Sequence, residues 1–373
     1  AGAAQPETPP RRAPASPAGP APGPALEAAR ARLSAAERPV VVAGVGALAH
    51  RAEAAVAEAC RRLGAPLVTT YKAKGVLPED DPLALGGHGL SPKSDAVVLP
   101  LLRRADLVLT VGYDPIEMRA GWRDPWDPEA CVALDHLPNR HGMHGASVSF
   151  VGDVGAGLAA LTDGLAPNRE TWPGGEPSAA RAALEAAFAD PGDWGPHAAL
   201  AAARRALPED GIATADSGAH RILMSQMWRC ARPRALLQSS GFCTMGCALP
   251  LAIGAKVAAP ERDVLAVMGD AGAEMVLGEL ATLRDLRLPV VLLVMADESL
   301  ALIEMKQRRE GLRALGVDFG GTDWPAVARA MGGRGVAARD AETVEAAIRE
   351  GLRAETFTLV AAALPRGAYD GAF

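Results

Sequence analysis

Residues 264–299 of this chain read VLAVMGDAGAEMVLGELATLRDLRLPVVLLVMADES, and they carry the clearest secondary-structure pattern of the sequence. It begins with the short apolar run Val264–Met268 and closes on a second apolar run, Val290–Met295. Between the runs, apolar residues recur at the three- and four-residue spacing of a helix face, at Val276, Leu280, Leu283 and Leu286. Two apolar runs joined by one helix predict a strand–helix–strand unit whose strands are parallel and lie side by side or nearly so.

An aspartate follows each of the two predicted strands. Asp270 comes directly after Gly269, and Asp297 comes directly after Ala296. Open α/β sheets bind ligands at the carboxyl ends of their strands, so both carboxylates are expected at that edge. Two such oxygen ligands beside a glycine-rich turn suit a magnesium ion that bridges to a phosphate. The alternative is that Asp270 only caps the following helix and that Asp297 is an ordinary loop residue.

The same stretch resembles the thiamine diphosphate motif of the acetolactate synthase family, which opens with Gly-Asp and closes with Asn-Asn or Asn-Asp. Asp297 stands 27 positions after Asp270, in keeping with the family spacing. The resemblance implies that Asp270, Asp297 and the carbonyl of Ser299 bind Mg²⁺. It also implies that thiamine diphosphate lies against three neighbouring backbone positions, Gly269, Ala271 and Gly272. The chain departs from the motif at Ala271, where glycine is usual, and at Ala296, where the family has its first asparagine.

Composition excludes several classes of protein. The 373 residues carry a formal net charge of −6 and no basic block, which argues against nucleic-acid binding as a main role. No apolar run approaches the roughly 18 residues that span a membrane, so no membrane partner is expected. The five cysteines are scattered and odd in number, and a reduced, cytoplasmic protein is therefore predicted.

The chain divides into two blocks of domain size. Residues 1–36 are rich in alanine and proline and are expected to be a linker, with a short helix allowed at Leu26–Leu33. A second linker is expected at 166–190, between a central domain at 37–165 and a further domain at 191–373. The central domain contains a predicted helix over 49–63 and five predicted strands, at 40–43, 66–70, 105–111, 131–134 and 148–151. The expected fold class is α/β, with two Rossmann-like, doubly wound parallel sheets.

The turn Gly44-Val45-Gly46 after the first predicted strand has two interpretations. It can open a dinucleotide site, but no acid stands near Thr70, at the end of the second strand, to hold a ribose. A structural turn is therefore favoured. Residues 112–117 (GYDPIE) resemble the catabolic, pyruvate-specific branch of acetolactate synthases, in whose family this central domain is structural or holds a nucleotide, sometimes a flavin. The flavin-dependent branch is the poorer match, so FAD is not expected.

Two segments of the second block resemble cofactor-binding loops of the family. In residues 214–220 (TADSGAH) the resemblance implies diphosphate contacts from Ser217, Gly218 and His220, and backbone amides beside a glycine suit phosphate oxygens. The alternative is a plain strand-to-helix turn in which Asp216 caps the helix.

The second segment, residues 240–250 (SGFCTMGCALP), is similar to the family's segment under the aminopyrimidine ring. By position, Met245 would wedge the cofactor into its bent form, and the Cys243 carbonyl would accept the 4′-amino group. A core methionine is the alternative for Met245. Gln307 stands where the family often has glutamine near the substrate, and a solvated helix residue is an equal alternative there.

The family's chemistry also needs a glutamate that bonds N1′ of the cofactor and promotes its imino form. That glutamate belongs to a separate pyrimidine-binding domain, which precedes the central domain, and no glutamate of this chain corresponds to it. We therefore expect a separate pyrimidine-binding polypeptide, from a split gene or a cleaved precursor, in a heterotetramer or a dimer of heterodimers.

The resemblance implies an acetolactate synthase-like subunit that binds thiamine diphosphate through Mg²⁺. Such an enzyme decarboxylates a 2-oxo acid, with pyruvate as the expected substrate, and joins the two-carbon unit to an acceptor carbonyl. Two alternatives remain open: a subunit of a simple 2-oxo acid decarboxylase, and a non-catalytic binding or regulatory subunit.

Overall fold

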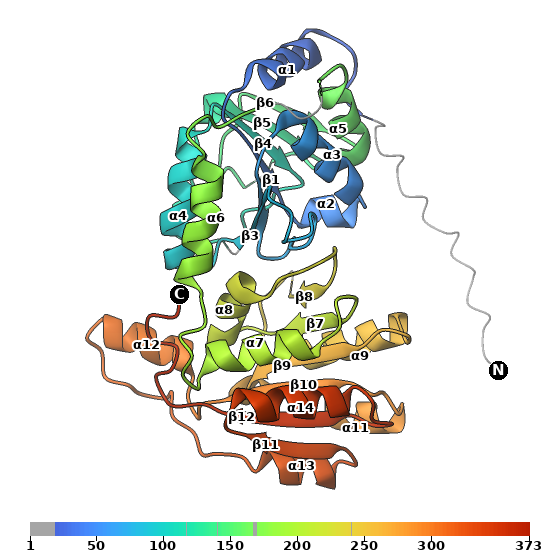
Figure 1. Cartoon of the computed structure of the whole chain (residues 1–373), viewed down its shortest axis with the longest axis vertical. Helices are drawn as coiled ribbons and strands as arrows, with labels where there is room; N and C mark the ends of the chain where they lie inside the picture. The colour runs from blue at the N-terminus through green and yellow to red at the C-terminus, as the bar shows by residue number, and fades with distance from the viewer. Residues whose placement is uncertain (1–18, 117, 140, 167–169, 240) are drawn as a thin grey trace, which may run out of the picture.

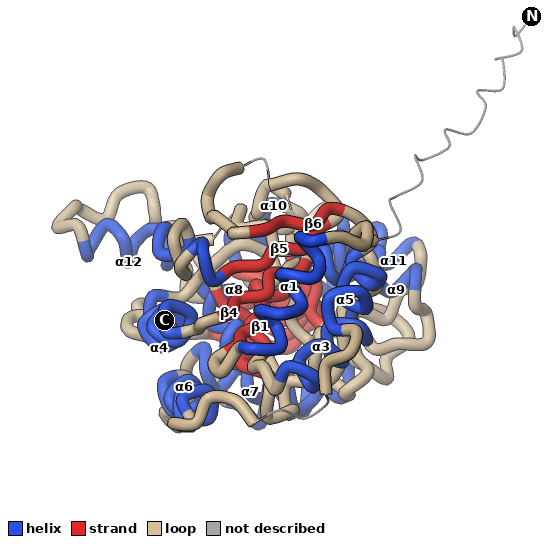
Figure 2. The backbone as a smooth tube through the Cα atoms, turned by 90° about the horizontal axis from the view of Figure 1, so that it is seen from above, coloured by secondary structure: helices blue, strands red, loops and turns tan. Residues whose placement is uncertain are grey.

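The computed structural model describes residues 19–116, 118–139, 141–166, 170–239 and 241–373. Two six-stranded parallel sheets organise these residues, with helices packed around the strands (Figures 1 and 2). The α/β class with two doubly wound parallel sheets is therefore confirmed. Residues of both sheets, among them Val40 and Leu293, belong to one buried apolar cluster, so the two domains share packed surface. None of the helices in the described ranges is long and apolar enough to cross a membrane.

The first sheet has the strand order β3-β2-β1-β4-β5-β6, so the direction of winding reverses between β1 and β4. Its strands are β1 (Pro39–Ala43), β2 (Leu67–Thr70), β3 (Ala84–His88), β4 (Leu107–Val111), β5 (Cys131–Asp135) and β6 (Val148–Val151). Its connections include α2 (Val45–Ala49), α3 (Glu53–Leu63), α4 (Pro92–Arg104), α5 (Val154–Thr162) and the short 3₁₀ turns η1 (Ala120–Trp122) and η2 (Pro128–Ala130).

Five of these strands match the predicted ones, and two details differ. The helix predicted over 49–63 is confirmed as α3, but it begins later than predicted, because the chain turns at Arg51, whose φ is 53°, after the separate short helix α2. The sequence does not predict β3, because ALGGH contains two glycines and no β-branched residue.

The second sheet has the strand order β11-β12-β10-β9-β7-β8. Its strands are β7 (Ile212–Ala215), β8 (Leu236–Gln238), β9 (Val264–Gly269), β10 (Val291–Ala296), β11 (Arg334–Ala338) and β12 (Thr358–Ala363). Its helices are α7 (Pro196–Ala206), α8 (Ala219–Met227), α9 (Ala248–Ala258), α10 (Asp270–Met275), α11 (Glu279–Asp285), α12 (Ala301–Arg309), α13 (Trp324–Ala330) and α14 (Ala341–Gly351). Strands β9 and β10 are parallel neighbours, with Leu265 opposite Val291, which confirms the strand–helix–strand unit, although α10 and α11 share its helical part.

Both stretches expected as linkers contain a helix, and the first of these helices covers the predicted Leu26–Leu33. Helix α1 (Pro24–Ala35) buries Leu26, Ala29 and Leu33 in the apolar cluster under the first sheet. Helix α6 (Glu176–Ala187) lies beside α4 and buries Ala180 and Leu184 (Figure 1). Alanine has the highest helix propensity, so these alanine-rich segments fold once a few apolar residues at helical spacing find a partner. The boundaries of the two domains otherwise stay a prediction.

The glycine turn after β1 is a site of close backbone approach. A Cβ at Gly44 would lie 2.3 Å from the carbonyl oxygen of Gly112, and one at Gly46 would lie 2.8 Å from the Gly112 Cα. Gly112 itself has a φ of +55°. Two loops thus pack backbone to backbone at the ends of β1 and β4, and this contact accounts for the glycines without a dinucleotide.

Candidate functional site

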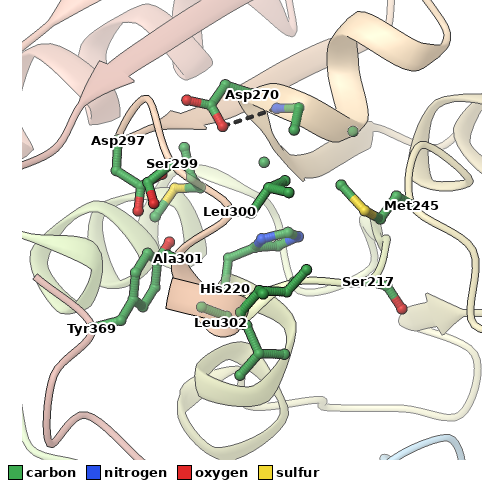
Figure 3. Close-up of a pocket in the computed structure, with 17 residues that line it drawn as sticks. Ser217, His220, Met245, Asp270, Asp297, Ser299, Leu300, Ala301, Leu302 and Tyr369 are labelled. Carbon is green, nitrogen blue, oxygen red and sulfur yellow. Dashed lines mark hydrogen bonds between the residues drawn. The ribbon is translucent and has the colours of Figure 1, made fainter. Parts of the chain in front are cut away.

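A cavity of about 190 Å³ lies at the carboxyl edge of the second sheet (Figure 3). The loops that follow β7, β9 and β10 form it, which is the edge where the sequence predicts a ligand site. Ten of the predicted site residues line it: Ser217, Gly218, His220, Met245, Gly269, Asp270, Ala271, Gly272, Asp297 and Ser299. Cys243 and Gln307 are not among its lining residues.

Two buried carboxylates face this cavity. Asp270 is 4% exposed, and its two oxygens accept the backbone N–H groups of Ala271 at 2.9 Å and Glu298 at 2.8 Å. Asp297 is 6% exposed, and its Oδ2 is buried without a hydrogen-bond partner. Burial, followed by the negative charge of Asp270, raises the pKa of Asp297 to about 7, and burial also raises the pKa of Asp270. The pair is a place of concentrated, poorly compensated negative charge, which fits a cation.

The structure does not fit the alternatives, in which Asp270 only caps a helix and Asp297 is an ordinary loop residue. Gly269 is the N-cap residue of α10 and makes no side-chain cap, whereas Asp270 is the first residue inside the helix. The Asp270 carboxylate also accepts the backbone N–H of Glu298, which belongs to the loop after β10. Asp297 is buried, which is uncommon for an ordinary loop acid.

The described residues do not form a magnesium site from protein side chains alone. Across the described ranges, no group of three or more His, Cys, Asp or Glu side chains is arranged to hold a metal ion. The predicted set is smaller, since it consists of the Asp270 and Asp297 carboxylates and the Ser299 carbonyl. Magnesium prefers six oxygen ligands and commonly completes its shell with water and substrate phosphates. These residues therefore fit a metal that arrives with a phosphate group.

The loop after β7 carries a buried acid–histidine pair. The ring Nε2 of His220 donates to Oδ1 of Asp216 at 2.7 Å, and the exposed fractions of the two side chains are 3% and 0%. Asp216 does not cap α8, because the N-cap residue is Gly218 and it has no side-chain cap. A Cβ at Gly218 would lie 2.7 Å from the ring Nδ1 of His220, so glycine is required for the ring to pack here.

Met245 lies on the opposite side of the cavity from Asp297 in the view of Figure 3. The hydroxyl of Ser217 donates to the carbonyl oxygen of Cys243, which ties the loop after β7 to the segment that carries Met245. That carbonyl, predicted to accept the 4′-amino group, therefore already accepts one hydrogen bond, and an amide carbonyl has two lone pairs. Cys243 has a φ of 50°, a conformation uncommon for a residue with a side chain.

Gln307 lies outside the cavity lining and closes a turn. Its amide nitrogen donates to the carbonyl oxygen of Leu315 at 3.2 Å, and its amide oxygen accepts the Leu315 N–H at 3.4 Å. The glutamine thus holds the chain that follows α12. Its predicted substrate contact stays a prediction that the described contacts do not support.

The cavity also contains residues that the sequence does not single out. Leu300 and Leu302, at the start of α12, line it with apolar surface. Tyr369 enters from the C-terminal segment, is 4% exposed, and has its pKa raised first by burial and then by the nearby aspartates. The apolar pair follows Asp297 closely enough to be suspected from the sequence. A single tyrosine after the last strand gives no such signal.

A second cavity of about 420 Å³ lies where the winding of the first sheet reverses. The hydroxyl of Tyr113 and both ring nitrogens of His144 line it and are buried without hydrogen-bond partners. This is the crevice where doubly wound sheets place nucleotides. That FAD is not bound stays a prediction of the sequence.

Comparison with known proteins identifies both domains. Residues 26–161 match the family described as "Thiamine pyrophosphate enzyme, central domain", and residues 216–362 match "Thiamine pyrophosphate enzyme, C-terminal TPP binding domain". An acetolactate synthase of Bacillus subtilis is 30% identical over 345 residues, which cover 90% of this chain and 60% of that protein. A probable 2-ketoarginine decarboxylase of Pseudomonas aeruginosa is 32% identical over 345 residues, with the same two shares covered.

An acetolactate synthase large subunit of Parasynechococcus marenigrum is 30% identical over 370 residues, which cover 93% of this chain and 58% of that protein. The chain therefore spans about three fifths of the length of these relatives.

Proposed function

The chain belongs to the thiamine pyrophosphate enzymes, and we propose that its cavity at the edge of the second sheet binds the diphosphate end of the cofactor through Mg²⁺. The observation that carries the proposal is the buried pair Asp270 and Asp297, one of whose oxygens has no partner. A divalent cation at this point compensates both charges, and a diphosphate supplies the oxygen ligands that the protein lacks.

Each lining residue then has a role that its position supports. Asp270, Asp297 and the Ser299 carbonyl hold the metal. Four backbone positions that line the cavity offer N–H groups to phosphate oxygens: Gly218, Gly269, Ala271 and Gly272. His220 contacts the diphosphate, and Ser217 keeps its loop joined to Cys243. Met245 supports the ring system from the far side.

When bound, thiamine diphosphate supplies the carbanion-stabilising chemistry that decarboxylation of a 2-oxo acid requires. The residues of this chain add an apolar wall to the cavity, formed by Leu300, Leu302 and Tyr369. We propose an acetolactate synthase-like reaction, in which a 2-oxo acid such as pyruvate is decarboxylated and its two-carbon unit is joined to an acceptor carbonyl. The names of the Bacillus and Parasynechococcus relatives support this choice.

A simple decarboxylase is the second candidate, since the Pseudomonas relative is named a probable 2-ketoarginine decarboxylase. A non-catalytic binding or regulatory subunit is the third. Product analysis after incubation with pyruvate separates them: acetolactate supports the carboligase, acetaldehyde supports the decarboxylase, and no turnover in the assembled complex supports the third.

The proposed reaction needs a group that the cavity does not provide. No glutamate occurs among the described residues that line it, and this supports a carboxylate for the aminopyrimidine ring from another domain. We propose that a separate pyrimidine-binding polypeptide brings this glutamate, in a cytoplasmic heterotetramer or dimer of heterodimers. Intact-mass analysis of the complex from its native host tests this: a stoichiometric second chain of about 150–200 residues, one domain in size, supports it. A single longer polypeptide would contradict it.

The cofactor site is tested by titrating thiamine diphosphate and Mg²⁺ into the wild-type chain and into Asp297→Ala. The variant should lose cofactor binding, because a ligand of the metal is gone. Asp285→Ala is the matched control, since that aspartate lies in the same domain and its side chain is 65% exposed. Binding retained by Asp297→Ala would count against the site assignment.

A further inference from the structure

We propose that Asp216 is a positioning residue for the diphosphate site, which acts through His220 and through the Met245 loop (residues 241–247). The inference rests on the proposed function, because it explains how the proposed contacts are held in place. Asp216 does not line the cavity itself. It lies directly behind the lining, with no exposed surface, at the end of β7.

Three segments of the site meet at this one carboxylate. Oδ1 accepts from Nε2 of His220 at 2.7 Å, and Oδ2 accepts from the backbone N–H of Gly246 at 2.5 Å. The third segment is α10: a Cβ on Gly272 would lie 2.2 Å from Oδ2 and 3.1 Å from the Gly246 nitrogen. Each segment also carries a proposed cofactor contact, namely His220 itself, Met245 and Asp270.

The Asp216 carboxylate and its two donors, His220 and Gly246, hold one another in place. A buried carboxylate is costly unless hydrogen bonds compensate it, and here the compensation comes from His220 and Gly246. The reverse also holds, because removal of the acceptor leaves both donors buried without partners. The arrangement therefore penalises independent movement of the loop after β7 and the Met245 loop.

The bond to Asp216 also decides which ring nitrogen of His220 faces a ligand. A carboxylate only accepts, so the nitrogen that points at Asp216, Nε2, carries a proton. The other nitrogen, Nδ1, lies beside Gly218 and Gly269: a Cβ on these glycines would lie 2.7 Å and 3.6 Å from it. Both glycines line the cavity. Figure 3 shows the His220 ring between Leu302 and Leu300, in the middle of the lining. A hydrogen bond behind a ligand-contacting histidine sets its orientation in this way at metal sites too.

The test compares the wild-type chain with Asp216→Ala and with Asp216→Asn. The Nε2–H of His220 is followed by ¹⁵N-histidine NMR in the full chain, with His220→Gln used to assign the signal. Asp216→Ala should remove the hydrogen-bonded Nε2–H signature, because the acceptor is gone. Asp216→Asn keeps the volume, but the two donors approach different oxygens of Asp216, so the amide nitrogen of asparagine would face one of them. Both variants should bind thiamine diphosphate with Mg²⁺ at least about tenfold more weakly than wild type, the loss expected for a hydrogen bond to a charged group.

Ser94→Ala is the matched control. Its hydroxyl bonds the buried His88 ring at 2.6 Å in the central domain, so the variant also loses a buried histidine hydrogen bond. It should lower the melting temperature without changing cofactor affinity or the His220 signal. Wild-type affinity in both Asp216 variants overturns the inference, as does an equal loss in Ser94→Ala. If wild type itself binds no cofactor, the proposed function falls and the inference falls with it.

Discussion

The substitution Asp297→Asn should stabilise the metal-free chain, because it removes a buried and poorly compensated negative charge. The carboxylate is 6% exposed, and its pKa is raised to about 7 by burial and by Asp270. An acid with a raised pKa prefers its neutral form in the folded state. Its ionisation therefore destabilises the fold increasingly as pH rises from the unfolded pKa near 3.9 toward 7.

The magnitude follows from the size of the pKa change. For a folded pKa of about 7 and an unfolded pKa of about 3.9, the cost at pH 8 is about 4 kcal/mol. Water that enters the cavity screens the charge, so we expect about 2–4 kcal/mol in practice. At pH 5.5 the cost is about half as large, because Asp297 is then mostly neutral in the folded chain. Asparagine has the same shape and no charge, so it removes the cost.

The assay is urea unfolding of wild type and Asp297→Asn in EDTA, at pH 8 and pH 5.5. The variant should have the larger free energy of unfolding at both pH values, with the larger difference at pH 8. Asp285→Asn, with a 65% exposed side chain, should show no difference. If Asp297→Asn is no more stable than wild type at pH 8, the carboxylate is well compensated without a cation, and the reasoning is refuted.

Three further predictions concern the rest of the fold. Gly272→Ala should weaken binding of thiamine diphosphate and Mg²⁺ at least about tenfold, because the new Cβ would lie 2.2 Å from Asp216 and displace it. Titration calorimetry checks this, and Gly278→Ala, with open space around its Cβ position, should bind normally. Leu33→Ala should lower the free energy of unfolding by about 2–4 kcal/mol, since this α1 residue is fully buried, and an unchanged urea midpoint would restore the linker interpretation. Burial lowers the pKa of His88 to about 4, so its neutral ring stabilises the fold above pH 6.5 and loses this effect as pH falls toward 4. The deficit of His88→Gln relative to wild type should therefore shrink by about 2 kcal/mol between pH 7.5 and pH 5, and a constant deficit would contradict the shift.

The parts of the fold that the sequence predicts are those with strong local signals. Strands β9 and β10 are fully apolar runs that end at an aspartate-containing turn, so their pairing and the edge that carries Asp270 and Asp297 follow directly. Strand β3 lacks such a signal because its ALGGH sequence is held by pairing with β2 rather than by propensity. The sequence does not predict helix α6, because prolines and glycines surround it. Packing against α4 stabilises this helix.

In the candidate site, too, only features with a local sequence signal are predicted. Residues on short loops near the motif are brought together as predicted, whereas contacts between distant segments are not visible in the sequence. Asp216 is predicted only as a cap, because its bond to Gly246 joins positions 30 residues apart. Tyr369 reaches the cavity only through the path of the C-terminal segment. Gln307 is not among the lining residues, and its amide bonds Leu315 instead, so its substrate contact stays a prediction.

The most direct test of the central claim is the binding of Mn²⁺, which suits the same oxygen ligands as Mg²⁺. Free Mn²⁺ is followed by electron paramagnetic resonance as the wild-type chain is added, with and without thiamine diphosphate. If Asp270 and Asp297 hold a metal that the diphosphate completes, one Mn²⁺ per chain should bind in the presence of the cofactor and little without it. Mn²⁺ that stays free in both samples, or that binds equally well without the cofactor, would contradict the account.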